Sequence, residues 1–253
     1  MALRIGQTCV IAAGLLACCA LALRYLNRAG QIRQFRRMSL HSLALIQRDH
    51  LNDPVFLFYF GRRLNDAGSS DQAIPVLERA AGLEPDDGPV RDEWARALLQ
   101  TGQVTRAFGE LRQYLGTHPG SAEAHYLIGK FYFTEGSLAP ARSALQEAVR
   151  LDAGSGQAWS LLAQALIKTS DTGGAEAAVR KALAIRPDSA EDHVQLASLL
   201  AARNLPAADK EFRTAIELAP GNEEAHREYS RYLLAQKRAP EAETQARLAT
   251  RLR

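Results

Sequence analysis

Histidine and cysteine side chains are the natural starting point for any chemistry in this sequence. His125, His193 and His226 recur along the chain, and the three cysteines all lie near its start, at Cys9, Cys18 and Cys19. Metal ligands must lie about 2 Å from one shared ion, and a catalytic nucleophile needs a base within hydrogen-bond reach. The sequence has no paired-cysteine zinc pattern, HExxH motif, GxSxG motif or Walker loop. It therefore predicts no enzyme, no metal site and no cofactor.

The histidines belong to a repeat that runs from Pro54 to Arg253. A small residue recurs every 34 residues, and once after 33, at Gly61, Ala95, Gly129, Ala163, Ala197 and Ser230. A second set follows at Ala73, Ala107, Ala141, Ala175, Ala208 and Ala242, with Leu77, Leu111, Leu145, Val179, Phe212 and Ala246 four residues later. Small residues let two helices approach closely, and the larger side chain fills the space beside them. This spacing predicts pairs of packed helices.

The turn between the two helices of each unit also recurs. Glycine occupies it at Gly68, Gly102 and Gly136, where a left-handed backbone is expected. The later units have Ser170, Asn204 and Lys237 there. The single spacing of 33 indicates a deletion between Ala197 and Ala208.

This pattern resembles the tetratricopeptide repeat family, which implies an all-α, right-handed solenoid that binds other proteins. The resemblance covers six units, at 54–87, 88–121, 122–155, 156–189, 190–222 and 223–253. The early-helix tryptophan of the family is matched only by Trp159, and His125, His193 and His226 take the same position in other units. Successive layers of packed helices lie about 10 Å apart. The histidines are therefore expected to replace the tryptophan structurally and not to share a metal ion.

The resemblance further implies that the first helix of each unit lines a concave groove. The residues carried over to this predicted groove are Phe58, Arg62, Asn65, Arg96, Leu99, Tyr126, Lys130, Phe133, Gln164 and Arg231. Arg62, Arg96 and Lys130 recur every 34 residues and are expected to stack along it. Such a basic ladder suits an extended acidic or carboxylate-ended peptide, because arginine pairs bidentately with carboxylates. The alternative is a solvated charged face.

The N-terminal segment predicts a membrane anchor within residues 1–29. Residues 5–23 contain no charged side chain, and a helix of about 20 apolar residues crosses a bilayer. A signal peptide would have a shorter apolar core, so we expect a retained transmembrane helix. The alternative is a lipidated periplasmic protein, because the residues before Cys18 and Cys19 resemble a bacterial lipobox.

Charge predicts the orientation of this anchor. Residues 1–48 carry seven arginines and no acid, whereas the rest of the chain has a net charge of −4, which argues against nucleic acid as a partner. The arginines that follow residue 23 are Arg24, Arg28, Arg33, Arg36 and Arg37. By the positive-inside rule they place the repeats in the cytoplasm, with a single pass through what we expect to be a bacterial inner membrane. They are expected either to contact anionic lipid or to solvate a linker.

Residues 30–53 are predicted to form a basic juxtamembrane linker that Gly30 separates from the anchor, followed by a helix that caps the first repeat. Leu40, Leu43 and Ile46 have the spacing of such a helix. The sequence as a whole predicts a membrane-anchored scaffold for the assembly of a membrane-associated complex. The alternative is a constitutive subunit of a larger membrane complex, and no small-molecule substrate is expected.

Overall fold

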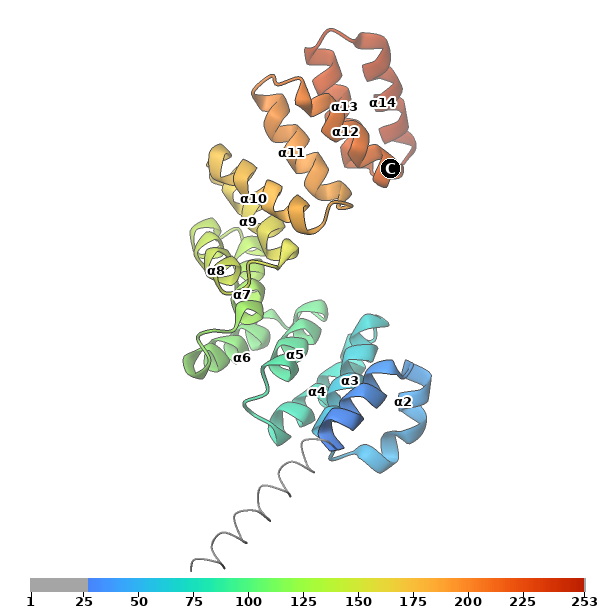
Figure 1. Ribbon diagram of the computed structural model, residues 1–253, viewed down its shortest axis with the longest axis vertical. Helices are drawn as coiled ribbons and strands as arrows, with labels where there is room; N and C mark the ends of the chain where they lie inside the picture. Colours follow the sequence, from blue (N-terminus) through green and yellow to red (C-terminus); the bar gives the residue numbers. More distant parts are fainter. Residues whose placement is uncertain (1–26, 253) are drawn as a thin grey trace, which may run out of the picture. The chain divides into compact units, whose positions relative to one another are not determined.

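The structure is a computed structural model that describes residues 27–252 (Figure 1). The predicted membrane-spanning segment 5–23 lies outside the described residues, as do Arg24 and both candidate lipidation sites, Cys18 and Cys19. Every regular element within the described range is a helix. None of these helices is both long and apolar enough to cross a membrane.

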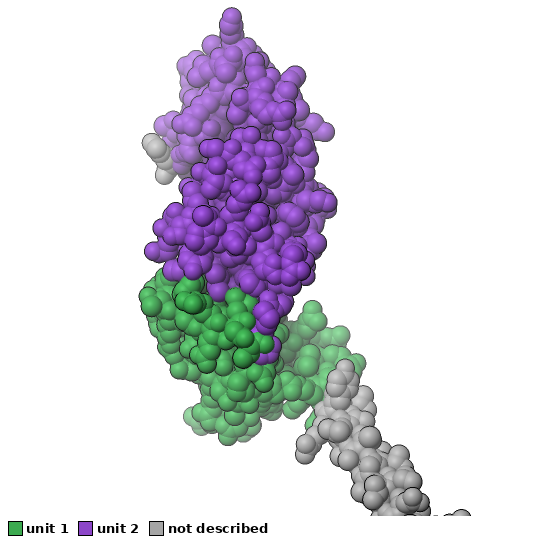
Figure 2. Space-filling view, turned by 90° about the vertical axis from the view of Figure 1, so that its left-hand side faces the viewer, with its two compact units in different colours: residues 1–117 green, residues 118–253 purple. Residues whose placement is uncertain are grey.

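The chain forms two compact units, Met1–Thr117 and His118–Arg253, coloured separately in Figure 2. After a helical segment at 27–37, unit 1 contains α2 (Leu40–Ile46), the 3-10 helix η1 (Gln47–His50), α3 (Pro54–Asp66), α4 (Ser70–Leu83), α5 (Gly88–Gln100) and α6 (Val104–Thr117). Unit 2 contains α7 (Ala122–Thr134), α8 (Leu138–Leu151), α9 (Gly156–Lys168), α10 (Thr172–Ile185), α11 (Ala190–Ala202), α12 (Ala207–Leu218), α13 (Glu223–Ala235) and α14 (Ala239–Arg251).

The first helix of every repeat begins where the sequence places the start of a unit. A short polar side chain caps each of them by accepting a hydrogen bond from a backbone N–H of the first turn, at Asp53, Asp87, Ser121, Ser155, Ser189 and Asn222. Each cap stabilises its helix by about 1 kcal/mol. The helix boundaries are thus specified locally, one repeat at a time.

The turns confirm the expected left-handed backbone in all six repeats. The glycines at 68, 102 and 136 have φ values of 75°, 76° and 74°. Ser170, Asn204 and Lys237 adopt the same conformation, with φ values of 62°, 55° and 61°. A side chain with a Cβ is strained there, so the last three repeats hold this turn at some expense in stability.

Close contact between the paired helices depends on the small residue of the first helix. A Cβ added at Gly61 would lie 2.5 Å from Cγ of Leu77, and one at Gly129 would lie 2.6 Å from Cγ of Leu145. Both leucines are fully buried. The small and large positions therefore fit together as the spacing predicts.

The segment before the first repeat differs from the prediction. Residues 27–37 form a helix that runs through Gly30, so glycine does not break the chain there, and the segment is not an open linker. Phe35 of this helix and Leu43 of α2 are buried in one apolar cluster with Phe56 and Leu77. This burial outweighs the roughly 1 kcal/mol that glycine costs inside a helix. The same cluster includes buried side chains of repeats one and two, whereas most buried apolar side chains of repeats three to six belong to another.

The tryptophan position of the family makes a specific hydrogen bond, which we call the turn clamp. In repeats two to six its side-chain N–H donates to the carbonyl six residues earlier, before the helix begins. The donors are Arg91, His125, Trp159, His193 and His226, and the acceptors are the carbonyls of Pro85, Pro119, Ala153, Pro187 and Pro220, at 3.0–3.3 Å. The histidines therefore replace the tryptophan as donors, which confirms their structural role.

In repeats two, five and six, a polar side chain of the second helix contacts the side chain of the turn clamp. Arg91 donates to Glu110 at 2.9 Å, and Nδ1 of His193 lies 2.7 Å from a carboxylate oxygen of Glu211. Nδ1 of His226 instead contacts the Gln245 amide. Repeats two, five and six thus pair the turn clamp with a polar side chain of the second helix.

Candidate protein-binding site

The first helices lie next to one another within each unit, as the groove prediction requires. Helix α3 contacts α5 in unit 1, and in unit 2 helix α7 contacts α9 and α11 contacts α13. The predicted groove residues are therefore considered unit by unit, with Phe58, Arg62, Asn65, Arg96 and Leu99 in unit 1 and Tyr126, Lys130, Phe133, Gln164 and Arg231 in unit 2.

In unit 1 the basic residues of the predicted groove differ in their partners. Arg62 is exposed, and no side chain among the described residues pairs with it. Arg96 is also exposed, but its guanidinium lies 3.9 Å from the buried carboxylate of Glu93. Phe58 is half-buried and stands one helical turn before Arg62 on α3. Of the two predicted groove cations in unit 1, Arg62 is therefore the one without an acidic partner among the described residues.

Asn65 is not an open groove residue as predicted, because it is buried between the first two repeats. Its amide donates to the carboxylate of Glu93 at 2.8 Å and to the Glu93 carbonyl at 3.1 Å. Its own Oδ1 is buried and has no partner among the described residues. The side chain thus holds α3 to α5 and leaves one acceptor unused. Glu93 was not foreseen, because a helix-periodic pattern does not show that a glutamate will be buried.

In unit 2 the aromatic residues of the predicted groove are half-buried. Tyr126 and Phe133 pack against the core of this unit, and Lys130 is exposed between them on α7. Nζ of Lys168 lies over the Phe133 ring at 5.5 Å from its centroid, a cation–π contact that the sequence analysis missed. Ile167 is the residue of repeat four that is equivalent to Phe133, and Lys168 is the next residue of α9. The repeat alignment could therefore have predicted that Lys168 lies near Phe133.

The remaining predicted groove residues, Gln164 and Arg231, expose fewer unpaired groups to a partner. Gln164 is half-buried, and Arg231 is exposed but donates to Glu228 on the same helix at 2.8 Å. Lys130 belongs to unit 2 and Arg96 to unit 1, so the three-membered ladder stays a prediction. The structure itself shows Arg62 and Lys130 as exposed cations, each beside an aromatic side chain on its own helix.

A buried polar network lies between repeats four and five and was not predicted. Asp192 is 0% exposed, although the equivalent residue is alanine in repeats three, four and six. Its carboxylate accepts hydrogen bonds from the Ser160 hydroxyl and from Arg186, the latter at 2.8 Å. Gly156 leaves room for Arg186, because a Cβ there would lie 2.8 Å from its Nε. Through Ser160 the network fixes α11 against α9.

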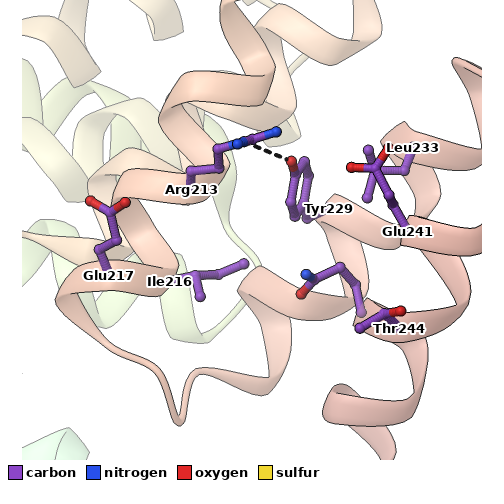
Figure 3. Close-up of a pocket in the computed structure, with 8 residues that line it drawn as sticks. Arg213, Ile216, Glu217, Tyr229, Leu233, Glu241 and Thr244 are labelled. Atoms are coloured by element: carbon purple, nitrogen blue, oxygen red, sulfur yellow. Dashed lines mark hydrogen bonds between the residues drawn. The ribbon is translucent and has the colours of Figure 1, made fainter. Parts of the chain in front are cut away.

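A cavity of about 380 Å³ opens between α12, α13 and α14. Its lining residues are Arg213, Ile216, Glu217, Tyr229, Leu233, Glu241, Thr244 and Gln245 (Figure 3). Figure 3 shows the guanidinium of Arg213 pointing at the Tyr229 hydroxyl, to which it donates at 3.1 Å. That hydroxyl donates in turn to Asp209 at 2.9 Å. The polar wall of this cavity is therefore occupied by contacts within unit 2.

Asp209 accepts hydrogen bonds from Tyr229 and from Arg238 and thereby connects α12 to α13 and to the start of α14. Partial burial acts to raise the pKa of its carboxyl, but hydrogen bonds from Arg238 and Tyr229 and the charge of Arg213 together hold that pKa below its ordinary value. Burial raises the pKa of the Tyr229 hydroxyl, and its hydrogen bond to Asp209 adds to the effect. The cluster joins the last two repeats and offers no free cation to a ligand.

The arginines expected to contact a membrane differ in whether an acidic side chain pairs with them. Arg28 donates to both carboxylate oxygens of Glu84, so it holds the 27–37 helix to the end of α4 and is not free for lipid. Its pKa is raised by that hydrogen bond. Arg33, Arg36 and Arg37 are exposed.

Comparison with known proteins agrees with this architecture. The tetratricopeptide repeat family matches residues 64–131, 98–165, 132–199 and 197–253. The BBSome complex member bbs-4 of Caenorhabditis elegans is 24% identical over 182 residues, which is 72% of this chain and 39% of that protein. This chain thus spans well under half the length of that relative.

Two solved structures share the fold at low sequence identity. The pilF structure of Pseudomonas aeruginosa is 19% identical, with a TM-score of 0.70, over 81% of this chain and 93% of that one. YrrB, described as a TPR protein with an unusual peptide-binding site, is 19% identical, with a TM-score of 0.60, over 70% of this chain and 92% of that one. Together with the family match and the regular helix pairs, these similarities show that the chain belongs to the tetratricopeptide repeat family.

Proposed function

We propose that this protein is a membrane-anchored adaptor that binds an extended, carboxylate-bearing segment of a partner protein along the predicted groove. The observation that carries the proposal is the face of α3. Phe58, Arg62 and Asn65 are spaced by four and three residues, so they share one side of that helix. Phe58 and Arg62 bring together an aromatic surface and an exposed guanidinium that has no partner among the described residues, whereas Asn65 is buried and holds α3 to α5.

Each of these groups suits one part of an extended peptide. A guanidinium forms charge-assisted, bidentate hydrogen bonds with a carboxylate. The ring of Phe58 supplies apolar contact area. The peptide-binding site ascribed to YrrB, on the same fold, supports a role in peptide recognition.

The membrane anchor is the second part of the proposal. Residues 5–23 are uncharged, and arginines but no acid follow them up to Asp49. This asymmetry supports a single pass, with the repeats on the cytoplasmic side of a bacterial inner membrane. The adaptor would then gather partners at the membrane surface during the assembly of a membrane-associated complex.

Replacement of Arg62, Arg96 and Lys130 by alanine tests the groove. A hydrogen bond to a charged group contributes about 1.5–3 kcal/mol, so loss of Arg62 alone should weaken partner binding roughly tenfold to a hundredfold. The measurement is quantitative mass spectrometry of proteins that copurify with the full chain from detergent-solubilised native membranes. The matched control is Arg150→Ala, which removes an exposed arginine that is already paired with Glu147 on α8, outside the predicted groove.

Equal recovery of partners by the parent chain and the triple variant would refute the groove proposal. A fixed stoichiometric set of subunits that survives the triple variant would favour the alternative of a constitutive subunit. The topology has its own test, because protease added to spheroplasts should leave cytoplasmic repeats intact. Digestion from the periplasmic side would exclude that orientation and favour the lipidated periplasmic form.

A further inference from the structure

Helix α2 has two faces of different character. Leu43 on the inner face is fully buried, and Leu40 and Ile46 pack against the same core. The opposite face carries His41, Ala44, Leu45 and Arg48, all exposed and spaced as one helical stripe that continues into η1. We call these four residues the α2 outer face. Leu45 is 73% exposed, more than any other large apolar residue in the described range.

The α2 outer face lies in a strongly basic part of the chain. Arg36 and Arg37 end the helix that directly precedes α2, and both are exposed. No acidic side chain among the described residues pairs with either of them, or with His41 or Arg48. The contrast is Arg28 in the same segment, which Glu84 and Asp87 neutralise. The segment that carries the exposed Leu45 therefore also carries cations without an acidic partner among the described residues.

This combination of groups selects among possible partners. Nucleic acid would pair with the arginines, but it offers Leu45 no apolar environment unless bases are unstacked. The described cations are accompanied on this face by leucine and alanine and by no phenylalanine, tyrosine or tryptophan ring on which bases could stack. An anionic bilayer surface meets both needs at once, because headgroups bind the cations and the acyl boundary takes up the leucine.

We propose that the α2 outer face, with Arg36 and Arg37, is a second membrane contact that seats unit 1 on an anionic lipid surface. The inference rests on the proposed anchor and deepens it. Only residues 24–26 separate the predicted span from the described helix at 27–37, and three residues reach at most about 11 Å. That helix is fixed to unit 1 through Phe35 and Arg28. Unit 1 is thereby kept against the bilayer, and the α2 outer face determines which side it presents.

The test places a polarity-sensitive fluorophore at Leu45 of the full chain. Cys9, Cys18 and Cys19 are changed to serine, Leu45→Cys is labelled with NBD, and the chain is reconstituted into two kinds of vesicle. One contains phosphatidylcholine alone, and the other contains phosphatidylcholine with roughly one-third phosphatidylglycerol. The matched control is Leu234→Cys, because Leu234 is 58% exposed and lies on α13 of unit 2, far from the α2 outer face in the sequence.

The expected result is a blue-shifted emission at position 45, quenched by doxyl-labelled lipid, in the anionic vesicles only. The emission of the label at position 234 should be that of a fluorophore in water with both kinds of vesicle. Each arginine near an anionic surface adds about 1 kcal/mol, or roughly fivefold in binding. Changing Arg36, Arg37 and Arg48 together to glutamine should therefore reduce, about a hundredfold, the ratio of molecules with the α2 outer face on the lipid surface to molecules with that face in water.

Flotation in the neutral vesicles separates the two proposals. A chain that fails to float with phosphatidylcholine alone refutes the anchor, yet a blue shift in anionic vesicles would still support the α2 contact. A chain that floats while the label at Leu45 reports water in both vesicles refutes the α2 contact and leaves the anchor standing. An equal blue shift in neutral and anionic vesicles also overturns the inference, because the arginines would then play no part.

Discussion

Removal of Arg186 is expected to destabilise unit 2, because it leaves the carboxylate of Asp192 buried without its cation. Asp192 is 0% exposed and Arg186 is its ion-pair partner at 2.8 Å. Removing one partner of a buried pair costs about 3–5 kcal/mol. Ser160 would still donate to the carboxylate, so we expect about 3 kcal/mol for Arg186→Ala. In a unit of this size that loss lowers the melting temperature by roughly 10 °C.

The double variant Arg186→Ala with Asp192→Ala provides the decisive comparison. Repeat six already carries Ala219 and Ala225 at the two equivalent positions, and Ala225 is fully buried there. With both charges removed, no buried charge remains uncompensated, so the double variant should lie within about 1 kcal/mol of the parent chain. The single change Asp192→Ala should be intermediate, because Arg186 is 34% exposed and can turn to water.

Hydrogen exchange followed by mass spectrometry is the suitable assay, since it resolves α9 and α11 from the helices of unit 1. Arg186→Ala should speed exchange in peptides from both helices, and the double variant should restore slow exchange. Thermal circular dichroism on the same samples gives the change in melting temperature. A double variant as unstable as Arg186→Ala, or a single variant as stable as the parent, would refute the assignment of Arg186 as the compensating charge.

Three further outcomes follow from the packing and the charges. Gly61→Ala should destabilise unit 1 by about 1–3 kcal/mol, because the added Cβ would lie 2.5 Å from Leu77. Gly30→Ala adds its Cβ to open space and should stabilise its helix by up to about 1 kcal/mol. Thermal melts of the two variants test both expectations. Lys237→Gly should raise the melting temperature slightly, because it relieves a backbone with φ of 61° that costs a side-chain-bearing residue about 1–2 kcal/mol. The lowered pKa of Asp209 means that its stabilising effect is complete above the unfolded pKa, near 3.8, and is lost as the pH falls through the still lower folded value. Asp209→Asn should therefore flatten the acid limb of the stability profile measured by urea unfolding between pH 2 and pH 5, and an unchanged limb would contradict this account.

The parts of the fold that depend on neighbours in the chain were predictable from the sequence. Left-handed turns at Ser170, Asn204 and Lys237 followed from the phase of the glycines in earlier repeats, and the helix starts followed from the same phase. The capping residues, such as Asp53 and Ser121, carry a familiar local signal and could have been predicted too. All of these features are decided within a few residues.

Features that join distant segments were harder to foresee. Phe35 and Ile32 have helical spacing, but Gly30 favoured a break, and only the packing of the segment on repeat one shows that the helix is retained. Asn65 has the helix phase of a groove residue, yet Glu93, 28 residues away, makes it a buried contact. Periodicity identifies which side of a helix a residue occupies but not which polar group the next helix brings to it. The anchor, the lipid contact and the basic ladder stay predictions.

The turn clamps have a consequence for how the chain acquires its structure. Each one joins residues only six positions apart, and the paired helix that supports it follows within about 20 residues. A repeat can therefore form its turn clamp and pack its two helices together soon after it leaves the ribosome, before the following repeat has been synthesised. Such short sequence separations favour rapid folding from many starting points along an array. The order of assembly would follow the order of translation, with the buried N-terminal helices of unit 1 in place to receive the first repeat.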